Sequence, residues 1–476
     1  KQQFDESPIS IPLKHIDLYT IHLNEYQENV YNYLLDNIKI SSTANEGLRY
    51  QIFQIPLNIL NITYPCELFD NIQIDNQIKF NKNFFIKNIG KDGLSSIFDD
   101  INKFPFSYKT DIITKYGRIF DNSIIKKYSS KIHNICNSIN NSEGITLIYS
   151  EKIYSGVLPM ALALEEMGFA RYNGNNLIKN KKSKFKYVMI TGNNLYSPNN
   201  NNEIEAVTNS NNNNGEKIKV VIISRAGSEG IDLKNIRNVH IMEPWYNMNR
   251  VEQVIGRAIR NKSHFLLPLE KRNCCIYLYG TLLNNETESI DLFLYRLAEN
   301  KSIKIGKITR VLKENSIDCL LTKKENIKYF DKDITSVELK LSNQNIISFD
   351  IGLKPFSNSC DYMETCHFNC MMYDNEYKKI SLLNENNNNN TYNKHYSELN
   401  VNDIIIKIKN LFKEKYYYSK YDIIMNICNK KIYPMNIIDY ALNEIVNNDL
   451  IIVFDRYDRR GKIVQIDNLY LFQPQE

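Results

Sequence analysis

The fold is decided between residues 222 and 260, where the sequence reads IISRAGSEGIDLKNIRNVHIMEPWYNMNRVEQVIGRAIR. An apolar strand leads into a turn that contains glycine, a second strand ends at Glu243, and a helical segment with two arginines follows. Glycines at the carboxyl end of a strand let the backbone approach a ligand closely, and open α/β sheets bind ligands at that edge. The stretch therefore predicts an α/β sheet with a binding site at the carboxyl ends of its strands.

The flanking sequence continues this alternation from about residue 124 to residue 280. Apolar runs typical of strands lie at 145–149, 187–191, 217–223, 238–243 and 274–278. Helical periodicity is found at 124–139, 157–167, 203–209, 249–261 and 290–301. Strands that alternate with helices predict a parallel sheet with helices on both faces.

Two arginines give the last helix of this stretch its chemistry. Arg257 and Arg260 are three residues apart, so both guanidinium groups project from one face of the helix. Two always-charged, bidentate donors that point the same way suit a phosphate group, and Arg260 could act as an arginine finger in phosphoryl transfer. Paired arginines are more often a solvated helix face. A binding site is favoured here by the neighbouring Glu229, Gly230, Asp232, Gln253 and Gly256.

The stretch resembles motifs V and VI of superfamily 2 helicases, which implies the second RecA-like lobe of such an enzyme. By this resemblance Gly230 and Asp232 line the nucleotide cleft, and Glu229 and Gly256 beside the motif positions belong to the same site. Gln253, Arg257 and Arg260 match motif VI, whose last arginine reaches the γ-phosphate. The resemblance also places four strand-end residues on the nucleic-acid backbone: Ser150, Thr191, Gly192 and Ser224.

Three further segments narrow the resemblance. Residues 142–150, 161–169 and 240–250 resemble the helicases of nucleo-cytoplasmic large DNA viruses, relatives of the ATPase subunit of poxvirus early transcription factor. The similarity extends from about residue 15 to the C-terminus. It implies an ATP-dependent helicase or translocase in viral transcription, acting on nucleic acid, DNA in preference to RNA. It also implies a viral RNA polymerase or transcription factor subunit as partner, in the virion and the host cytoplasm.

The sequence lacks the residues that hold the triphosphate in such enzymes. It contains no Gly-x-x-x-x-Gly-Lys-Ser/Thr loop and no strand that ends in Asp-Glu-x-His or Asp-Glu-x-Asp, which would bind ATP and Mg²⁺. The chain also begins with Lys1 rather than Met. We therefore expect a C-terminal piece that binds ATP and Mg²⁺ only together with a first RecA-like lobe. Alone, it should show negligible ATP hydrolysis.

The 476 residues are enough for about three domains. We expect an N-terminal bridging segment at 1–90, the RecA-like lobe at 91–330, a cysteine-containing extension with an asparagine-rich linker at 331–400, and a module at 401–476. This module has helix-sized segments at 403–415, 420–430 and 434–447, then short strands at 450–454 and 462–466. These are the parts of a winged helix, and its hairpin arginines Arg456, Arg459 and Arg460 could contact DNA.

Four of the nine cysteines suggest a metal site: Cys360, Cys366 and Cys370 form a cluster, and Cys319 lies upstream. No stretch reaches the about 18 apolar residues of a membrane span, and no signal-peptide core is present, so we expect a reducing compartment and no membrane partner. Four thiolates would complete a tetrahedral structural Zn²⁺ site. Their spacing is not that of the usual zinc knuckle, so small buried apolar residues are the alternative.

The net charge of +5 does not by itself establish binding to nucleic acid. Lys301, Lys304, Lys307 and Arg310 recur every three residues and could track a phosphate backbone, although a solvated helix face is the default. Two other functions stay open. One is a scaffold that binds DNA and recruits a polymerase, and the other is an RNA helicase in viral RNA processing or packaging.

Overall fold

The computed structural model describes residues 12–41, 49–72, 82–179, 185–225, 230–319, 336–350, 353–371, 394–429 and 431–475. The chain divides into two compact units, Lys1–Met371 and Met372–Glu476. Among the residues described, no helix is both long enough and apolar enough to cross a membrane.

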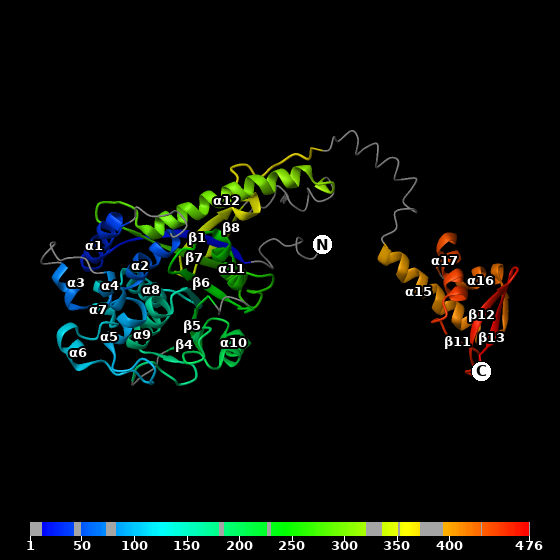
Figure 1. Ribbon diagram of the computed structural model, residues 1–476, viewed down its shortest axis with the longest axis horizontal. Coiled ribbons are helices and arrows are strands. Elements are labelled where there is room, and N and C mark those ends of the chain that lie inside the picture. Colours follow the sequence, from blue (N-terminus) through cyan, green and yellow to red (C-terminus); the bar gives the residue numbers. More distant parts are fainter. Residues whose placement is uncertain are drawn as a thin grey trace. The chain divides into compact units, whose positions relative to one another are not determined.

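A seven-stranded sheet, with all strands parallel, forms the centre of the first unit (Figure 1). Its spatial order is β1 (Leu13–His22), β7 (Asn273–Leu282), β6 (Ile236–Ile241), β2 (Ile145–Tyr149), β5 (Ile218–Ile223), β4 (Phe185–Ile190) and β3 (Phe169–Arg171). All five predicted strands are present, so the prediction of a parallel sheet is confirmed. The two edge strands, β1 and β3, are not among the predicted strands.

Strand β1 comes from the N-terminal residues that were expected to form a bridging segment. It pairs with β7 along its whole length, from Leu13 opposite Asn273 to His22 opposite Leu282. Helices α1 (Glu25–Ser41) and α2 (Arg49–Asn61) contribute buried residues to the same core as the sheet. The residues before position 90 that the structure describes are therefore part of the lobe.

Helices cover both faces of the sheet, as predicted, and each face has its own apolar core. Within β5, Val220 and Ile222 face one core while Val221 and Ile223 face the other, because successive strand residues point to opposite sides. Helices α8 (Ser130–Asn140) and α9 (Leu158–Glu166) pack on the first face. The second face is covered by α10 (Asn200–Thr208), α11 (Met248–Ala258) and the start of α12 (Ile290–Asn315).

The helix predicted at 124–139 is interrupted at Ser129. The chain forms α7 (Asn122–Tyr128) and then α8, and the Ser129 hydroxyl accepts a hydrogen bond from the amide of Ile132 over 3.1 Å. A serine in this position caps the N-terminus of a helix. The other short elements of this unit are α3 (Glu67–Ile72), α4 (Lys82–Lys87), α5 (Gly90–Ile97), α6 (Thr110–Tyr116) and the two-stranded sheet β8 (Ser336–Lys340) and β9 (Ile346–Asp350).

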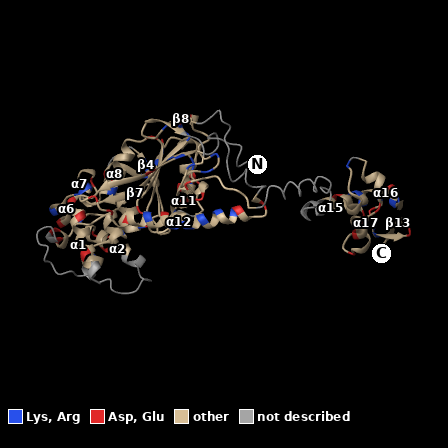
Figure 2. Ribbon diagram, turned by 90° about the horizontal axis from the view of Figure 1, so that it is seen from above, with Lys and Arg blue, Asp and Glu red and all other residues tan. Residues whose placement is uncertain are grey.

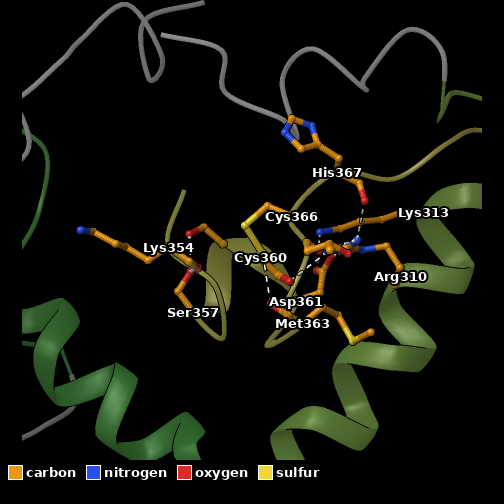
Figure 3. The surroundings of a disulfide bond; sticks show 11 residues. Arg310, Lys313, Lys354, Ser357, Cys360, Asp361, Met363, Cys366 and His367 are labelled. Carbon is orange, nitrogen blue, oxygen red and sulfur yellow. Dashed lines mark hydrogen bonds and ion pairs between the residues drawn. A yellow bond between two sulfur atoms is a disulfide. The ribbon is translucent and has the colours of Figure 1, made fainter. Parts of the chain in front are cut away.

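Helix α12 is longer than predicted, and segment 353–371 packs on one side of its second half. Gly306 permits this close approach, because a Cβ atom there would clash with the carbonyl oxygen of Asp361. Arg310 is buried in the contact, and its Nε donates to the Asp361 carboxylate over 2.8 Å (Figure 3). Arg310 therefore does not belong to a solvated basic stripe. Figure 2 shows the Lys and Arg residues of α12 as blue bands. Lys301, Lys304 and Lys307 on this helix are exposed.

The predicted zinc site is not supported, because the four cysteines are paired as disulfides. Cys319 pairs with Cys370 and Cys360 with Cys366, with Cα atoms 5.8 Å and 4.6 Å apart, the usual separation for such bonds. A disulfide sulfur is no longer the thiolate that zinc requires. The part of the chain that the structure describes also contains no group of three His, Cys, Asp or Glu side chains placed to hold a metal ion.

The second unit has the order helix, strand, helix, helix, hairpin. Its elements are α15 (Lys394–Leu411), β10 (Tyr417–Ser419), α16 (Lys420–Ile427), α17 (Met435–Asn447), β11 (Val453–Phe454), β12 (Arg460–Ile466) and β13 (Leu469–Pro474). The antiparallel sheet runs β10-β13-β12-β11. The three predicted helices and the strands near 453 and 462 are present, and β10 and β13 are additional. Tyr418 on β10 is buried in the core of this unit, whereas Tyr417 is exposed.

A buried ion pair joins α8 to the start of α12. Lys131 Nζ lies 2.8 Å from the Asp291 carboxylate, and neither side chain has any solvent exposure. Lys131 also donates to the carbonyl oxygen of Met242 over 2.8 Å and to Asn61 Oδ1 over 3.3 Å. The Asp291 carboxylate accepts from the hydroxyl of Thr281 over 3.0 Å. These bonds compensate two charges that would otherwise be costly to bury.

Replacing Lys131 with Met should lower the free energy of unfolding of the first unit by about 3–5 kcal/mol, because the buried Asp291 carboxylate loses its counter-charge. Urea denaturation followed by tryptophan fluorescence measures this, since the single tryptophan of the chain, Trp245, lies in this unit. The control is Lys126→Met at an exposed position of α7, with an expected change within about 0.5 kcal/mol. Equal losses in the two variants would contradict the importance of the ion pair.

Candidate functional site

The carboxyl ends of four neighbouring strands, β6, β2, β5 and β4, meet at one edge of the sheet. Backbone hydrogen bonds align the residues that follow them: the amide of Ser150 donates to Ile223 over 3.2 Å, and the amide of Ser224 donates to Ile190 over 3.1 Å. The structure thus brings together, along the predicted edge, Ser150, Thr191, Ser224 and Glu243.

Glu243, which follows β6, fixes the geometry of this edge. Its buried carboxylate accepts hydrogen bonds from Ser150 Oγ over 2.8 Å and from Asn61 Nδ2 over 2.8 Å. The backbone amides of Glu151 and Lys152 donate to the same carboxylate. Hydrogen bonds to a charged acceptor are stronger than neutral ones, so Glu243 holds the turn after β2 in place.

The predicted arginine finger lies next to the predicted nucleotide loop. Arg260 pairs with Asp232 over 3.2 Å, and its Nη2 donates to the carbonyl oxygen of Ile231 over 3.3 Å. The amide of Leu233 donates to the carbonyl oxygen of Arg257 over 3.3 Å, so the loop after β5 is joined to the end of α11. The side chains of Arg260 and Asp232 are 38% and 59% exposed, which leaves both accessible to a ligand.

Two glycines beside this ion pair have open space above them. Among the described residues, and chain neighbours aside, a Cβ atom on Gly230 or on Gly256 would meet no atom within 4 Å. Gly230 also has a φ of +74°, which favours glycine. On the same helix as Gly256, Gln253 is exposed and Arg257 is half-buried. Glu229 lies outside the described residues.

The hydroxyls that were expected to face nucleic acid are turned into the protein. Ser150, Thr191 and Ser224 are all buried. The Ser150 hydroxyl donates to Glu243, and the Thr191 hydroxyl shares a 2.8 Å hydrogen bond with that of Ser197. These side chains shape the edge and are not available to a ligand in this structure. Gly192, in contrast, is exposed.

A group of side chains that sequence reasoning did not single out lies on the same edge, and we name it the edge cluster: Glu151, Arg225, Trp245 and Arg250. The Arg250 guanidinium lies 3.7 Å from the centre of the Trp245 ring and 3.4 Å from the Glu151 carboxylate. Arg225 lies 3.8 Å from that carboxylate. Burial raises the pKa of Glu151, while nearby cations act to lower it. Their position could have pointed to them, because Glu151, Arg225 and Trp245 each lie two residues after the end of a predicted strand.

The basic side of α12 continues from the edge cluster through Tyr246. The Tyr246 ring packs 4.7 Å from the Trp245 ring. Lys301 lies 5.1 Å from the centre of the Tyr246 ring and donates to the Tyr246 carbonyl oxygen over 3.3 Å. The edge therefore combines aromatic faces with three cations, Arg225, Arg250 and Lys301, a combination that suits nucleic acid.

Comparison with known proteins gives a consistent result. Residues 130–262 match the family described as the helicase conserved C-terminal domain. The chain is 26% identical to an Acanthamoeba polyphaga mimivirus protein named as ATP-dependent RNA helicase L377, over 84% of this chain and 39% of that protein. It is 27% identical to nucleoside triphosphatase I of Choristoneura biennis entomopoxvirus, over 72% of this chain and 51% of that protein. Among solved structures, the C-terminal part of the Fun30 ATPase domain matches at 16% identity with a TM-score of 0.34, covering 60% of this chain and 90% of that one.

Residues 130–262 therefore match a helicase C-terminal domain and contain the centre of the parallel sheet, and the relatives of the chain include proteins named as helicases and nucleoside triphosphatases of giant viruses and entomopoxviruses. The resemblance to viral superfamily 2 helicases is confirmed at this level. The matched part of the chain spans 24% to 51% of the length of four such relatives, the two named above included. What the whole protein acts on, and with which partners, is therefore a matter for proposal.

Replacing Glu243 with Gln should loosen the turn after β2. An amide NH₂ group would face donors that now point at a carboxylate, and an unsatisfied buried donor costs about 1–3 kcal/mol. We expect hydrogen exchange at the amides of Glu151 and Lys152 to become faster by about tenfold or more. Exchange followed by mass spectrometry measures this, with Glu270→Gln at an exposed position as the control. Unchanged exchange in the Glu243 variant would show that its carboxylate does not hold the turn.

Proposed function

We propose that this chain is the C-terminal part of an ATP-dependent superfamily 2 helicase or translocase, and that it supplies the arginines that act on the nucleotide phosphates. The observation that supports this most directly is the position of Arg260. It lies beside Asp232 at the carboxyl edge of the sheet, with open space over Gly230 and Gly256. A partly exposed guanidinium beside a more exposed carboxylate can exchange that partner for a phosphate.

The residues of this chain suit the phosphate groups of the nucleotide. The lysine loop and the Mg²⁺-binding carboxylate would come from another lobe. Bound ATP supplies the phosphoric anhydride bond, and Mg²⁺ neutralises charge on its terminal phosphates. Arg257 and Arg260 would hold phosphate oxygens, and Gly230 and Gly256 would let the backbone come close. The 476 residues contain no lysine loop and no Asp-Glu strand. We therefore propose that a first RecA-like lobe provides these groups and that the chain alone has negligible ATP hydrolysis.

The nucleic acid is proposed to contact the edge cluster and Lys301 rather than the buried hydroxyls of Ser150 and Thr191. Arg225 is 61% exposed, so a phosphate could reach it beside Glu151. Trp245 and Tyr246 could stack on bases or sugars beside it. By the resemblance to viral relatives, the substrate is DNA in viral transcription, with a viral polymerase or transcription factor subunit as partner, in the virion and host cytoplasm. An RNA substrate is the alternative.

The C-terminal unit favours a second role, recruitment of a protein partner. Its arrangement is winged-helix-like, but α17, the helix that would enter a DNA groove, contains no Lys or Arg and exposes Met435 and Tyr440. The hairpin arginine Arg459 is already paired with Asp455 over 2.8 Å. A helix without cations suits a protein surface better than phosphates. This observation supports the scaffold function as an addition to the motor and not in place of it.

Replacing Arg260 with Gln in the longer protein that includes the lysine loop should lower ATP hydrolysis by about 10³-fold, the scale of an arginine finger. Steady-state hydrolysis at saturating ATP and Mg²⁺ measures this. Arg296→Gln, at an exposed position on α12, is the matched control and should leave the rate unchanged. Unchanged ATP hydrolysis in the Arg260 variant would contradict the proposed ATP-dependent motor function. Stimulation of the rate by duplex DNA, single-stranded DNA and RNA then separates a DNA motor from an RNA helicase.

Replacing Arg225 or Lys301 with Gln should weaken binding of this chain to a duplex oligonucleotide and make it less dependent on salt. Each lost phosphate contact reduces the slope of log Kobs against log [salt] by about one. Fluorescence anisotropy over a range of salt concentrations measures the slope. The control is Lys217→Gln, an exposed lysine just before β5, at the opposite edge of the sheet. Identical slopes in all variants would place the nucleic acid elsewhere.

A further inference from the structure

A cavity of about 450 Å³ lies at the amino-terminal edge of the sheet. Its walls include residues that precede or begin five parallel strands: Gly144, Phe185, Gly215, Arg237 and Lys271. Because all strands of the sheet are parallel, this edge is opposite to the one that holds Glu243 and Arg260. The cavity is therefore separate from the candidate helicase site, and its volume lies within the range of about 300–1,000 Å³ that is usual for small-molecule sites.

Arg237 is a buried cation in the wall of this cavity. Arg237 is only 3% exposed. Its Nη1 donates to the carbonyl oxygen of Lys271, and its Nη2 donates to that of Lys340 over 2.8 Å. Its Nε is buried and has no hydrogen-bond partner among the described residues. Both partners are neutral carbonyls, and among the described residues no carboxylate lies within ion-pair distance of Arg237; Glu143 and Glu270 act on its charge only from farther away. An incompletely compensated charge is costly to bury.

The backbone around the cavity makes room for this arginine. Gly144 has a φ of +81°, and a Cβ atom on it would clash with the aliphatic part of Arg237. Gly215 has a φ of +80°, and a Cβ atom on it would lie 3.3 Å from the carbonyl oxygen of Gly144. Both conformations favour glycine. Gly144 and Gly215, which are neighbours in space, therefore leave room beside the buried Arg237.

The other charged groups of the lining leave the cavity with an excess of positive charge. Lys271 pairs with Glu143 over 3.2 Å. Lys219 and Glu216 also line the cavity, so that with Arg237 there are three cations and two carboxylates. An anion that accepts a hydrogen bond from the Nε of Arg237 would satisfy this donor and balance the excess of positive charge.

We propose that this cavity binds a small organic anion whose carboxylate or phosphate group meets Arg237 and whose apolar part lies against Phe185 and Leu267. Both apolar residues line the cavity, which is larger than a bare oxyanion needs. Lys219, whose ammonium group lies 5.0 Å from the centre of the Phe185 ring, stands where the charged and apolar parts of the wall meet. The site is independent of the proposed motor function.

The test is calorimetric titration of phenyl phosphate, benzoate and inorganic phosphate into the 476-residue chain at constant ionic strength. Arg257→Gln and Arg260→Gln are present throughout, so that phosphate binding at the helicase site does not contribute. We expect saturable binding of phenyl phosphate or benzoate with one site per chain. The affinity for inorganic phosphate should be lower by at least about tenfold, because inorganic phosphate buries no ring against the apolar wall.

Variants at the rim of the cavity locate the binding. Lys219→Gln combined with Lys271→Gln should weaken binding of the organic anion by about tenfold or more, since each substitution removes a charged group that would attract the anion. Arg237→Lys, which keeps the charge but removes Nε, should do the same, with thermal melting to verify that it folds. Lys217→Gln, outside the lining, should bind normally. The proposal is overturned if no organic probe saturates, if inorganic phosphate binds equally well, or if the double lysine variant binds unchanged.

Discussion

The carboxyl edge of the sheet depends on a continuous buried chain of polar contacts from Asp291 through Lys131 and Asn61 to Glu243. These four residues lie on α12, on α8, at the end of α2 and after β6. Removing any one of them leaves a charge or a strong hydrogen-bonding group buried without its partner, which is costly in a low dielectric. The chain of contacts also explains why the N-terminal helices pack with the sheet, since Asn61 bridges the lysine and the glutamate.

Burial separates the residues that position this edge from those that can act on a ligand. Glu243, Ser150 and Thr191 are buried and satisfied within the protein, so they fix the backbone. Arg260 and Arg225 project from the same edge with large exposed fractions, each beside a carboxylate. A buried, hydrogen-bonded layer beneath exposed cations is the arrangement expected where charged groups must be placed accurately and still exchange partners.

The sequence predicted the centre of the fold well and its margins poorly, for physical reasons. Central strands such as Ile145–Tyr149 are buried on both faces and read as continuous apolar runs. The edge strand Leu13–His22 mixes polar and apolar residues, and Ile16 and Leu18 on it stay about half exposed. Apolar periodicity also ran through Ser129, because a capping serine is small enough to fit a helical pattern.

The sequence predicted the candidate site only for residues that belong to a recognisable motif. Two adjacent motifs led us to expect Arg260 and Asp232 in one nucleotide site, whereas their ion pair is seen only in the folded chain. The inward direction of Ser150 and Thr191 depends on Glu243 and Ser197, whose positions only the folded chain defines. The cysteines show the same limit, because spacing in the sequence does not distinguish four metal ligands from two disulfides.

Strand β1 has a consequence for how the protein is made. Leu13 pairs with Asn273 on β7, which is synthesised about 260 residues later, and at about 5–20 residues per second this interval is tens of seconds of translation. The sheet can assemble from β2 to β7 before this edge is added, whereas β1 must wait near the ribosome with its hydrogen-bonding groups unpaired. An unpaired strand is a site for wrong association with other chains. Nascent chains of this protein should therefore depend on protection of β1 until β7 emerges.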